Sequence, residues 1–218
     1  MMGRPASQTI DGPAGLLEVV MEEPDQAPLG LAVIAHPHPL HGGTMDNKVV
    51  HTLCRAFVLA GWRAVRFNFR GVGQSAGVWD EGRGETVDML SVVSHHMADP
   101  AFKGLPLALA GFSFGGYVAA QTHARLTEVA AQGRGPAAPQ QLVLVSPATS
   151  RNEVPAVPSH TLVVEGEQDD VVPLSSILDW ARPQNLPVTV IPGTGHFFHG
   201  QLTVLREVVV RHLRGNAV

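Results

Sequence analysis

The chain has 218 residues, which is enough for one domain with a sizeable hydrophobic core, and we expect residues 1–218 to form a single domain. Hydrophobic residues make up 44% of the chain and charged residues 16%, a balance typical of a globular rather than a disordered protein. The net charge of −4 and the scattered Lys and Arg residues give no electrostatic reason to expect nucleic acid or a membrane as a partner.

The single cysteine, Cys54, rules out an internal disulfide and fits a reducing compartment. No apolar signal core follows residues 1–8, and no apolar stretch is long enough to span a bilayer. We therefore expect a cytoplasmic protein.

In the first half of the chain, short apolar runs predict strands at residues 16–21, 29–35 and 63–69. A helix is predicted between the last two, because apolar residues recur at helical spacing before Gly61 at Val49, Leu53, Phe57 and Ala60. The same spacing marks a second helix at Val87, Leu90, Val93 and Met97.

In the second half, a strand at residues 105–110 runs into a glycine-rich turn, and a helix follows from about residue 115 through residue 126. After a loop at residues 131–140, three more strands are predicted, at residues 142–145, 162–165 and 188–191. Helices are predicted at residues 174–181 and along Leu202, Leu205, Val209 and Leu213. This alternation predicts a three-layer α/β/α sandwich around a mainly parallel, twisted sheet, with ligands bound beyond the carboxyl ends of its strands.

The glycine-rich turn reads GFSFGG and places Ser113 between a strand and a helix. A serine hydroxyl needs a base to become nucleophilic, and a sharp turn between strand and helix exposes it above the sheet. Small residues must flank such a turn, and Gly111 and Gly115 meet this requirement. Ser113 is therefore the predicted nucleophile.

The base and the acid are sought in the order Ser, Asp or Glu, then His, which this kind of site requires. His196 follows the last predicted strand in a glycine-lined loop, and His199 is its competitor three residues later. The loop after the strand at residues 162–165 carries two candidate acids, Asp169 and Asp170, and spacing allows either.

These motifs resemble the α/β-hydrolase superfamily, and specifically its small bacterial members related to dienelactone hydrolases and serine aminopeptidase-like esterases. The resemblance covers nearly the whole chain and rests on segments 36–45 (HPHPLHGGTM), 68–75 (NFRGVGQS), 111–116 (GFSFGG), 166–169 (GEQD) and 195–198 (GHFF). It implies an α/β-hydrolase fold and favours Asp169 over Asp170, because the family acid usually lies three residues after the glycine.

An oxyanion hole is expected from two backbone N–H groups. One belongs to Phe114, the residue after the nucleophile, and the other to the loop after residue 35. Proline has no N–H, which excludes Pro37 and Pro39 and leaves His38 and Leu40. Position relative to His36 favours His38.

Two other motifs resemble ligand sites. The histidines His36, His38 and His41 do not have a standard zinc spacing, so no metal or other cofactor is expected. The run that begins at Arg70 lacks the endings of phosphate-binding loops. We interpret it as a tight loop beside the active site, with Arg70 structural or ion-paired.

Only residues 146–159, with three prolines, separate two late strands at the place where many α/β hydrolases carry a cap domain. The sequence thus predicts a serine hydrolase without a cap, a carboxylesterase or thioesterase that cleaves small soluble esters or thioesters through an acyl-enzyme. The main alternative is a peptidase or amide hydrolase with the same triad. A catalytically silent binding protein is the alternative from another class.

Overall fold

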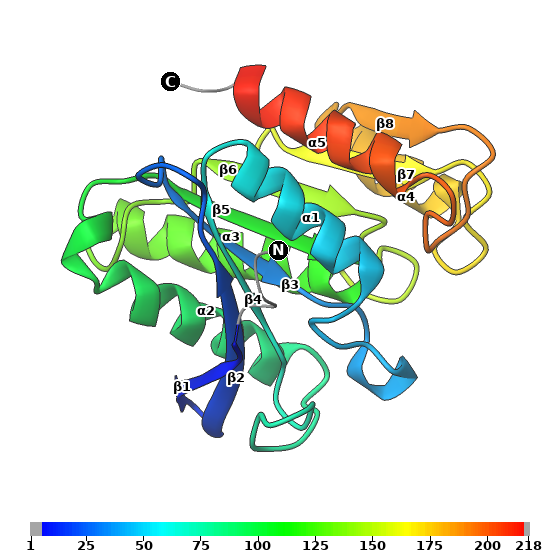
Figure 1. Cartoon of the computed structure of the whole chain (residues 1–218). Helices are drawn as coiled ribbons and strands as arrows, with labels where there is room; N and C mark the ends of the chain where they lie inside the picture. Colours follow the sequence, from blue (N-terminus) through cyan, green and yellow to red (C-terminus); the bar gives the residue numbers. More distant parts are fainter. Residues whose placement is uncertain (1–5, 216–218) are drawn as a thin grey trace.

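Within residues 6–215, the part of the chain that this computed structural model describes, eight strands form one twisted sheet (Figure 1). Residues 1–5, which belong to the N-terminal segment considered above, lie outside the described residues, as do residues 216–218. The strands, in chain order, are β1 (Gln8–Gly12), β2 (Gly15–Glu22), β3 (Leu31–Ala35), β4 (Arg63–Phe67), β5 (Leu107–Phe112), β6 (Gln141–Val145), β7 (Leu162–Gly166) and β8 (Val188–Ile191).

The spatial order of the strands is β1-β2-β4-β3-β5-β6-β7-β8. The first two pairings, β1 with β2 and β2 with β4, are antiparallel, and all the others are parallel. The carboxyl ends of β3 through β8 therefore meet at one edge, where ligands bind in parallel sheets of this kind.

Helices cover both faces of the sheet. On one face lie α1 (Lys48–Leu59) and α5 (Leu202–Gly215), which pack side by side (Figure 1). On the other face lie α2 (Arg83–Met97), α3 (Phe114–Ala131) and α4 (Leu174–Ala181). This arrangement confirms the predicted three-layer α/β/α fold.

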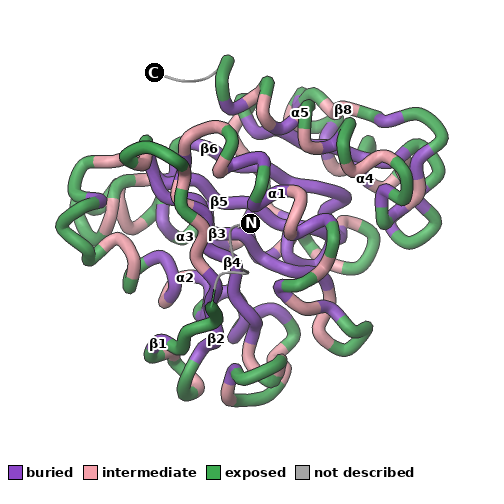
Figure 2. Tube along the Cα trace, viewed as in Figure 1, coloured by how far each residue is buried: buried purple, intermediate pink, exposed green. Residues whose placement is uncertain are grey.

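The central strands are buried on both faces, because their alternate side chains enter two separate cores. In β3, Leu31 and Val33 pack into the core beneath α2 and α3, whereas Ala32 and Ile34 pack into the core beneath α1. Figure 2 shows the result as a buried centre surrounded by exposed loops and outer helix faces. Strands buried on both faces must be apolar throughout, so continuous apolar runs in the sequence predict them.

The structure differs from the sequence prediction mainly at the ends of elements. The short, half-polar strand β1 was not predicted, and α2 begins at Arg83, before its first apolar marker. The strand predicted at residues 63–69 ends at Phe67, and the Phe69 N–H donates to the His36 ring rather than to a neighbouring strand.

Between β6 and β7, residues 146–161 contain no helix or strand, so no cap domain is present there. Three short 3₁₀ helices complete the described chain: η1 (Pro39–His41), η2 (Pro100–Phe102) and η3 (Arg182–Gln184). Among residues 6–215, none of the helices combines the length and the apolar character that crossing a membrane requires.

Candidate active site

Ser113 lies at the junction of β5 and α3, at the carboxyl edge of the sheet. Its backbone has φ 56° and ψ −119°, a conformation that a residue with a side chain rarely adopts and that costs on the order of 1–3 kcal/mol. The surrounding structure fixes it: the Ser113 N–H donates to the Val145 carbonyl of β6, and the Ser113 carbonyl accepts from Gly116 N–H. In this conformation the Ser113 hydroxyl faces the His196 ring and lines a cavity.

The glycines beside Ser113 are required by close backbone contacts. A Cβ atom on Gly111 would lie 2.0 Å from the Gly115 carbonyl oxygen, and one on Gly115 would lie 2.4 Å from the Ala35 carbonyl oxygen. Any larger residue would therefore push α3 away from β3 and β5.

The three predicted side chains Ser113, Asp169 and His196 come together in one hydrogen-bonded row. His196 Nε2 lies 3.1 Å from Ser113 Oγ, and His196 Nδ1 lies 2.6 Å from Asp169 Oδ2. All three residues are buried. Because a carboxylate only accepts hydrogen bonds, the Nδ1 atom carries the proton and Nε2 is left to accept the serine proton.

Asp169 is the acid that reaches His196, whereas Asp170 is exposed to solvent. Its second oxygen, Oδ1, accepts hydrogen bonds from the N–H groups of Val171 and Val172, at 2.9 and 2.7 Å. Burial alone would raise the pKa of Asp169, but the hydrogen bonds from His196 and Val172 outweigh it and hold this pKa below its usual value.

The two candidate bases, His196 and His199, also differ in their surroundings. The His196 ring contacts the rings of Phe112 and Phe197, with centroid distances of 4.8 and 5.1 Å. His199 is exposed and contacts Phe197 at 5.9 Å. The structure therefore brings His196, and not His199, to Ser113.

The loop after β3 distinguishes the two oxyanion candidates. The Leu40 N–H donates to His38 Nδ1 at 3.2 Å, and Leu40 is exposed. The backbone N–H groups of His38 and Phe114 have no hydrogen-bond partner among the described residues, and both residues line the cavity above Ser113. Of the two candidate oxyanion donors, this arrangement therefore favours His38 over Leu40.

His36 ties the loop after β3 to the segment after β4. His36 is fully buried, its Nδ1 lies 2.6 Å from the Pro37 carbonyl, and its Nε2 accepts from the Phe69 N–H. Burial lowers the pKa of His36 to about 3, so the ring is neutral. Residues 6–215 contain no group of three or more His, Cys, Asp or Glu side chains arranged to hold a metal ion.

Arg70 ties the neighbouring loop to α2. Its guanidinium forms two hydrogen bonds with the fully buried Asp88, at 3.0 and 2.8 Å, and its backbone N–H donates to the same carboxylate. Asp88 raises the pKa of Arg70 accordingly. Arg70 is ion-paired, and its guanidinium is committed to Asp88 and the Gly84 carbonyl.

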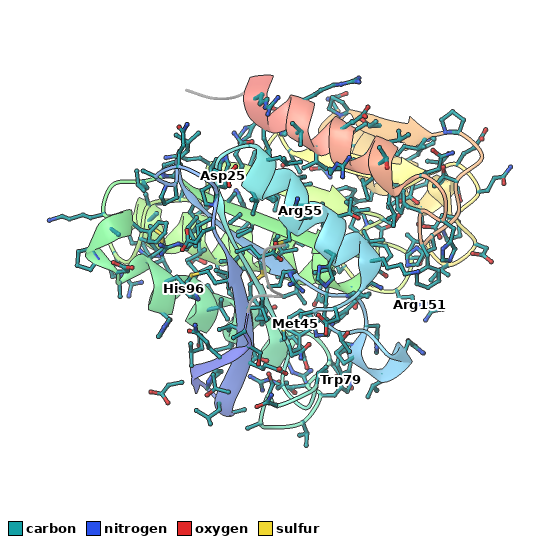
Figure 3. All side chains as sticks on the ribbon, in the orientation of Figure 1. Asp25, Met45, Arg55, Trp79, His96 and Arg151 are labelled. Carbon is teal, nitrogen blue, oxygen red and sulfur yellow. The ribbon has the colours of Figure 1, made fainter. Side chains whose placement is uncertain are left out.

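A cavity of about 610 Å³ opens directly above Ser113 and His196. Its wall is largely apolar and aromatic, and includes Phe114, Trp79, Val171, Val172 and Phe197. Two charged side chains also line it, Glu81 and Arg151, of which Glu81 is ion-paired with Arg83 at 3.1 Å. Figure 3 labels Trp79 and Arg151, which approach from the loops after β4 and β6.

Sequence reasoning did not identify Trp79 and Arg151 as cavity residues, because both lie in loops without a recognisable motif. It also missed the buried Glu165 at the end of β7, next to the Asp169 loop. The one available signal was a charged residue at the end of an otherwise apolar strand.

Comparisons with known proteins support the family and the fold. Residues 35–177 match the family described as "Serine aminopeptidase, S33". The chain is 39% identical to an alpha-beta serine hydrolase homologue from Coxiella burnetii, with a TM-score of 0.81 and coverage of 98% of this chain and 99% of that one.

It is also 34% identical to a serine hydrolase without lid from Xanthomonas campestris, with a TM-score of 0.85 and coverage of 100% and 98%. A dienelactone hydrolase from Anabaena variabilis shares the fold, with a TM-score of 0.73 at 17% identity over 98% and 99% of the two chains. The chain belongs to the serine aminopeptidase S33 family of the α/β-hydrolase superfamily and is a serine hydrolase of the α/β class.

Proposed function

We propose that the protein is a carboxylesterase or thioesterase that acts on small soluble acyl substrates through Ser113, His196 and Asp169. The observation that carries the proposal is the hydrogen-bonded row from Asp169 through His196 to Ser113 at the floor of the cavity. A cytoplasmic location and the absence of a nucleic-acid or membrane partner stay predictions.

In the first half of the reaction, Ser113 Oγ attacks the acyl carbonyl carbon while His196 Nε2 takes the hydroxyl proton. Asp169 stabilises the imidazolium that forms. The N–H groups of Phe114 and His38 bind the oxyanion, and His196 then gives its proton to the departing alcohol or thiol. The product of this half is an acyl group bound to Ser113.

In the second half, a water molecule enters the open cavity and His196 removes its proton as the water attacks the acyl-enzyme. The tetrahedral intermediate collapses, Ser113 regains its proton from His196, and the acid is released. Because no cap covers the site, we expect that activity does not require a lipid interface. We also expect the enzyme to prefer soluble substrates.

The charges around the cavity favour ester over peptide hydrolysis. A peptide N-terminus is an ammonium ion and would need a free carboxylate to bind it. The carboxylate that lines the cavity, Glu81, is paired with Arg83, and the other charged group is the cation of Arg151. The family name makes aminopeptidase activity the second candidate.

A substrate panel separates these candidates. We expect turnover of short-chain p-nitrophenyl esters or acyl thioesters, and little turnover of aminoacyl p-nitroanilides. Replacing Ser113 with Ala should lower kcat by on the order of a million-fold, as the loss of a triad member does elsewhere. Faster cleavage of the anilides would favour the aminopeptidase, and equal turnover by the Ser113→Ala variant would refute the proposal.

A further inference from the structure

Glu165 is a fully buried carboxyl at the end of β7, four residues before Asp169. Its Oε1 atom accepts two hydrogen bonds, from the Ser146 hydroxyl and from the Gly166 N–H, both at 3.0 Å. Its Oε2 atom is also buried but faces no N–H or O–H donor. A carboxylate oxygen in that position would be left unsatisfied, at a cost of several kcal/mol.

The carboxyl groups of Glu165 and Asp169 act on each other: besides burial, Asp169 raises the pKa of Glu165, and Glu165 lowers the pKa of Asp169 against the effect of burial. Two ionised carboxylates cannot form a hydrogen bond, because neither has a proton to donate. A proton on Glu165 Oε2 solves both problems, since it gives the buried oxygen a partner and replaces a charge repulsion with a donated bond. Asp169 is the group that keeps its charge, because His196, Val171 and Val172 already donate to it.

We propose that Glu165 is a protonated carboxylic acid that donates a hydrogen bond to Asp169 and so positions the triad acid for His196. It is a positioning residue, because it does not line the cavity and acts on the reaction through Asp169. The hydrogen-bonded row then extends from Ser146 through Glu165, Asp169 and His196 to Ser113. This inference rests on the proposed function, because it assigns Asp169 its catalytic role.

The surroundings of Glu165 agree with a neutral acid. It has no ion pair with any Lys, Arg or His among residues 6–215, and its register partner on β8 is the apolar Val190. On the β6 side, Glu165 accepts a hydrogen bond from the neutral Ser146. The charged group that acts on it is Asp169, which is itself hydrogen-bonded to His196. Burial, together with Asp169, raises the pKa of Glu165 to about 9.

The test compares two replacements of Glu165. Glu165→Gln keeps a buried N–H donor without a proton to lose, whereas Glu165→Leu has a similar volume and no donor. We expect the Gln variant to keep kcat within about threefold of wild type near pH 7. We expect the Leu variant to lose about 10- to 100-fold in kcat with little change in KM, the size of one hydrogen bond to a charged group.

Glu167→Gln is the matched control, because Glu167 lies two residues later, in the loop after β7, and is exposed. It should behave as wild type. Circular dichroism and thermal melting establish that each variant is folded. If Glu165→Leu unfolds, the Gln variant still tests the proposal through infrared spectra, where the signal of a protonated carboxyl at neutral pH should be present in wild type and absent in that variant.

The dependence of kcat on pH distinguishes the proposed role of Glu165 from a purely structural one. Above pH about 9 the wild-type Glu165 ionises, the donated bond is lost, and kcat falls, whereas the Glu165→Gln variant keeps its activity. The proposal is wrong if the Gln variant loses as much kcat as the Leu variant, or if the Leu variant is fully active. Activity that survives Ser113→Ala would instead overturn the proposed function, so the two failures are distinguishable.

Discussion

Gly115 packs directly against the backbone of Ala35, so that a Cβ atom at position 115 would lie 2.4 Å from the Ala35 carbonyl oxygen. This contact joins the start of α3 to the end of β3. It thereby holds the Phe114 N–H and the loop that carries His38 on the same side of Ser113.

Replacing Gly115 with Ala should therefore destabilise the protein by about 1–3 kcal/mol, because the methyl group has no room unless α3 moves. Gly215→Ala is the control, since a Cβ there would meet no neighbouring atom. Chemical denaturation measures both free energies of unfolding. Equal stability of the two variants would show that α3 can shift without cost.

The ion pair between Arg70 and Asp88 should contribute far more to stability than an exposed pair of similar length. Asp88→Asn leaves a largely buried guanidinium without its carboxylate, and we expect a loss of about 3 kcal/mol in the free energy of unfolding. Asp179→Asn breaks the Arg182–Asp179 pair, whose side chains are 69% and 72% exposed, and should cost less than about 1 kcal/mol. A similar loss in both variants would contradict a structural role for Arg70.

The backbone donor of the oxyanion hole can be tested with proline, which lacks an N–H group. His38 has φ −54°, which suits proline, so His38→Pro removes the donor with little backbone strain. We expect kcat to fall by about 100- to 1000-fold. His38→Ala keeps the N–H, so its kcat should fall by about tenfold or less, and the kcat of Leu40→Pro should fall by a similar amount. A larger loss of kcat in Leu40→Pro than in His38→Pro would assign the donor to Leu40.

Stability should also depend on pH through Glu165. Its pKa is about 9 in the folded protein against 4.5 for an ordinary Glu, so between these values the folded state holds a proton that the unfolded chain has released. The free energy of unfolding therefore decreases as the pH rises through this range and levels off above about pH 9.

Thermal melting of wild type and Glu165→Gln at several pH values checks this dependence. The variant lacks the titrating group. The Tm of wild type should therefore fall relative to the Tm of the variant as the pH rises from about 6 to about 9. Tm curves that stay parallel across this range would contradict a protonated Glu165 in the folded protein.

Much of the fold follows from the sequence because central strands buried on both faces need continuous apolar runs, and β3, β5 and β6 have them. The edge strand β1 has one buried residue, Ile10, so its pairing with β2 leaves little trace in the sequence. The order of Ser113, Asp169 and His196 along the chain likewise follows from their places after the carboxyl ends of β5, β7 and β8.

Other features depend on contacts between distant segments. The choice between His38 and Leu40 rests on a hydrogen bond within the loop that no sequence pattern specifies. The role inferred for Glu165 depends on the fact that Ser146 and Asp169 enclose it from two different loops. A single sequence shows a charged residue at the end of a strand but not what surrounds it.

The central claim is that Ser113 is the nucleophile of an acyl-enzyme. The most direct measurement is intact-protein mass spectrometry, followed by peptide mapping, after brief incubation with a p-nitrophenyl ester or a fluorophosphonate. We predict one added acyl or phosphonyl group, located on Ser113, and none in the Ser113→Ala or His196→Ala variants. Modification at another residue, or an unmodified wild-type protein that still hydrolyses the ester, would contradict the account.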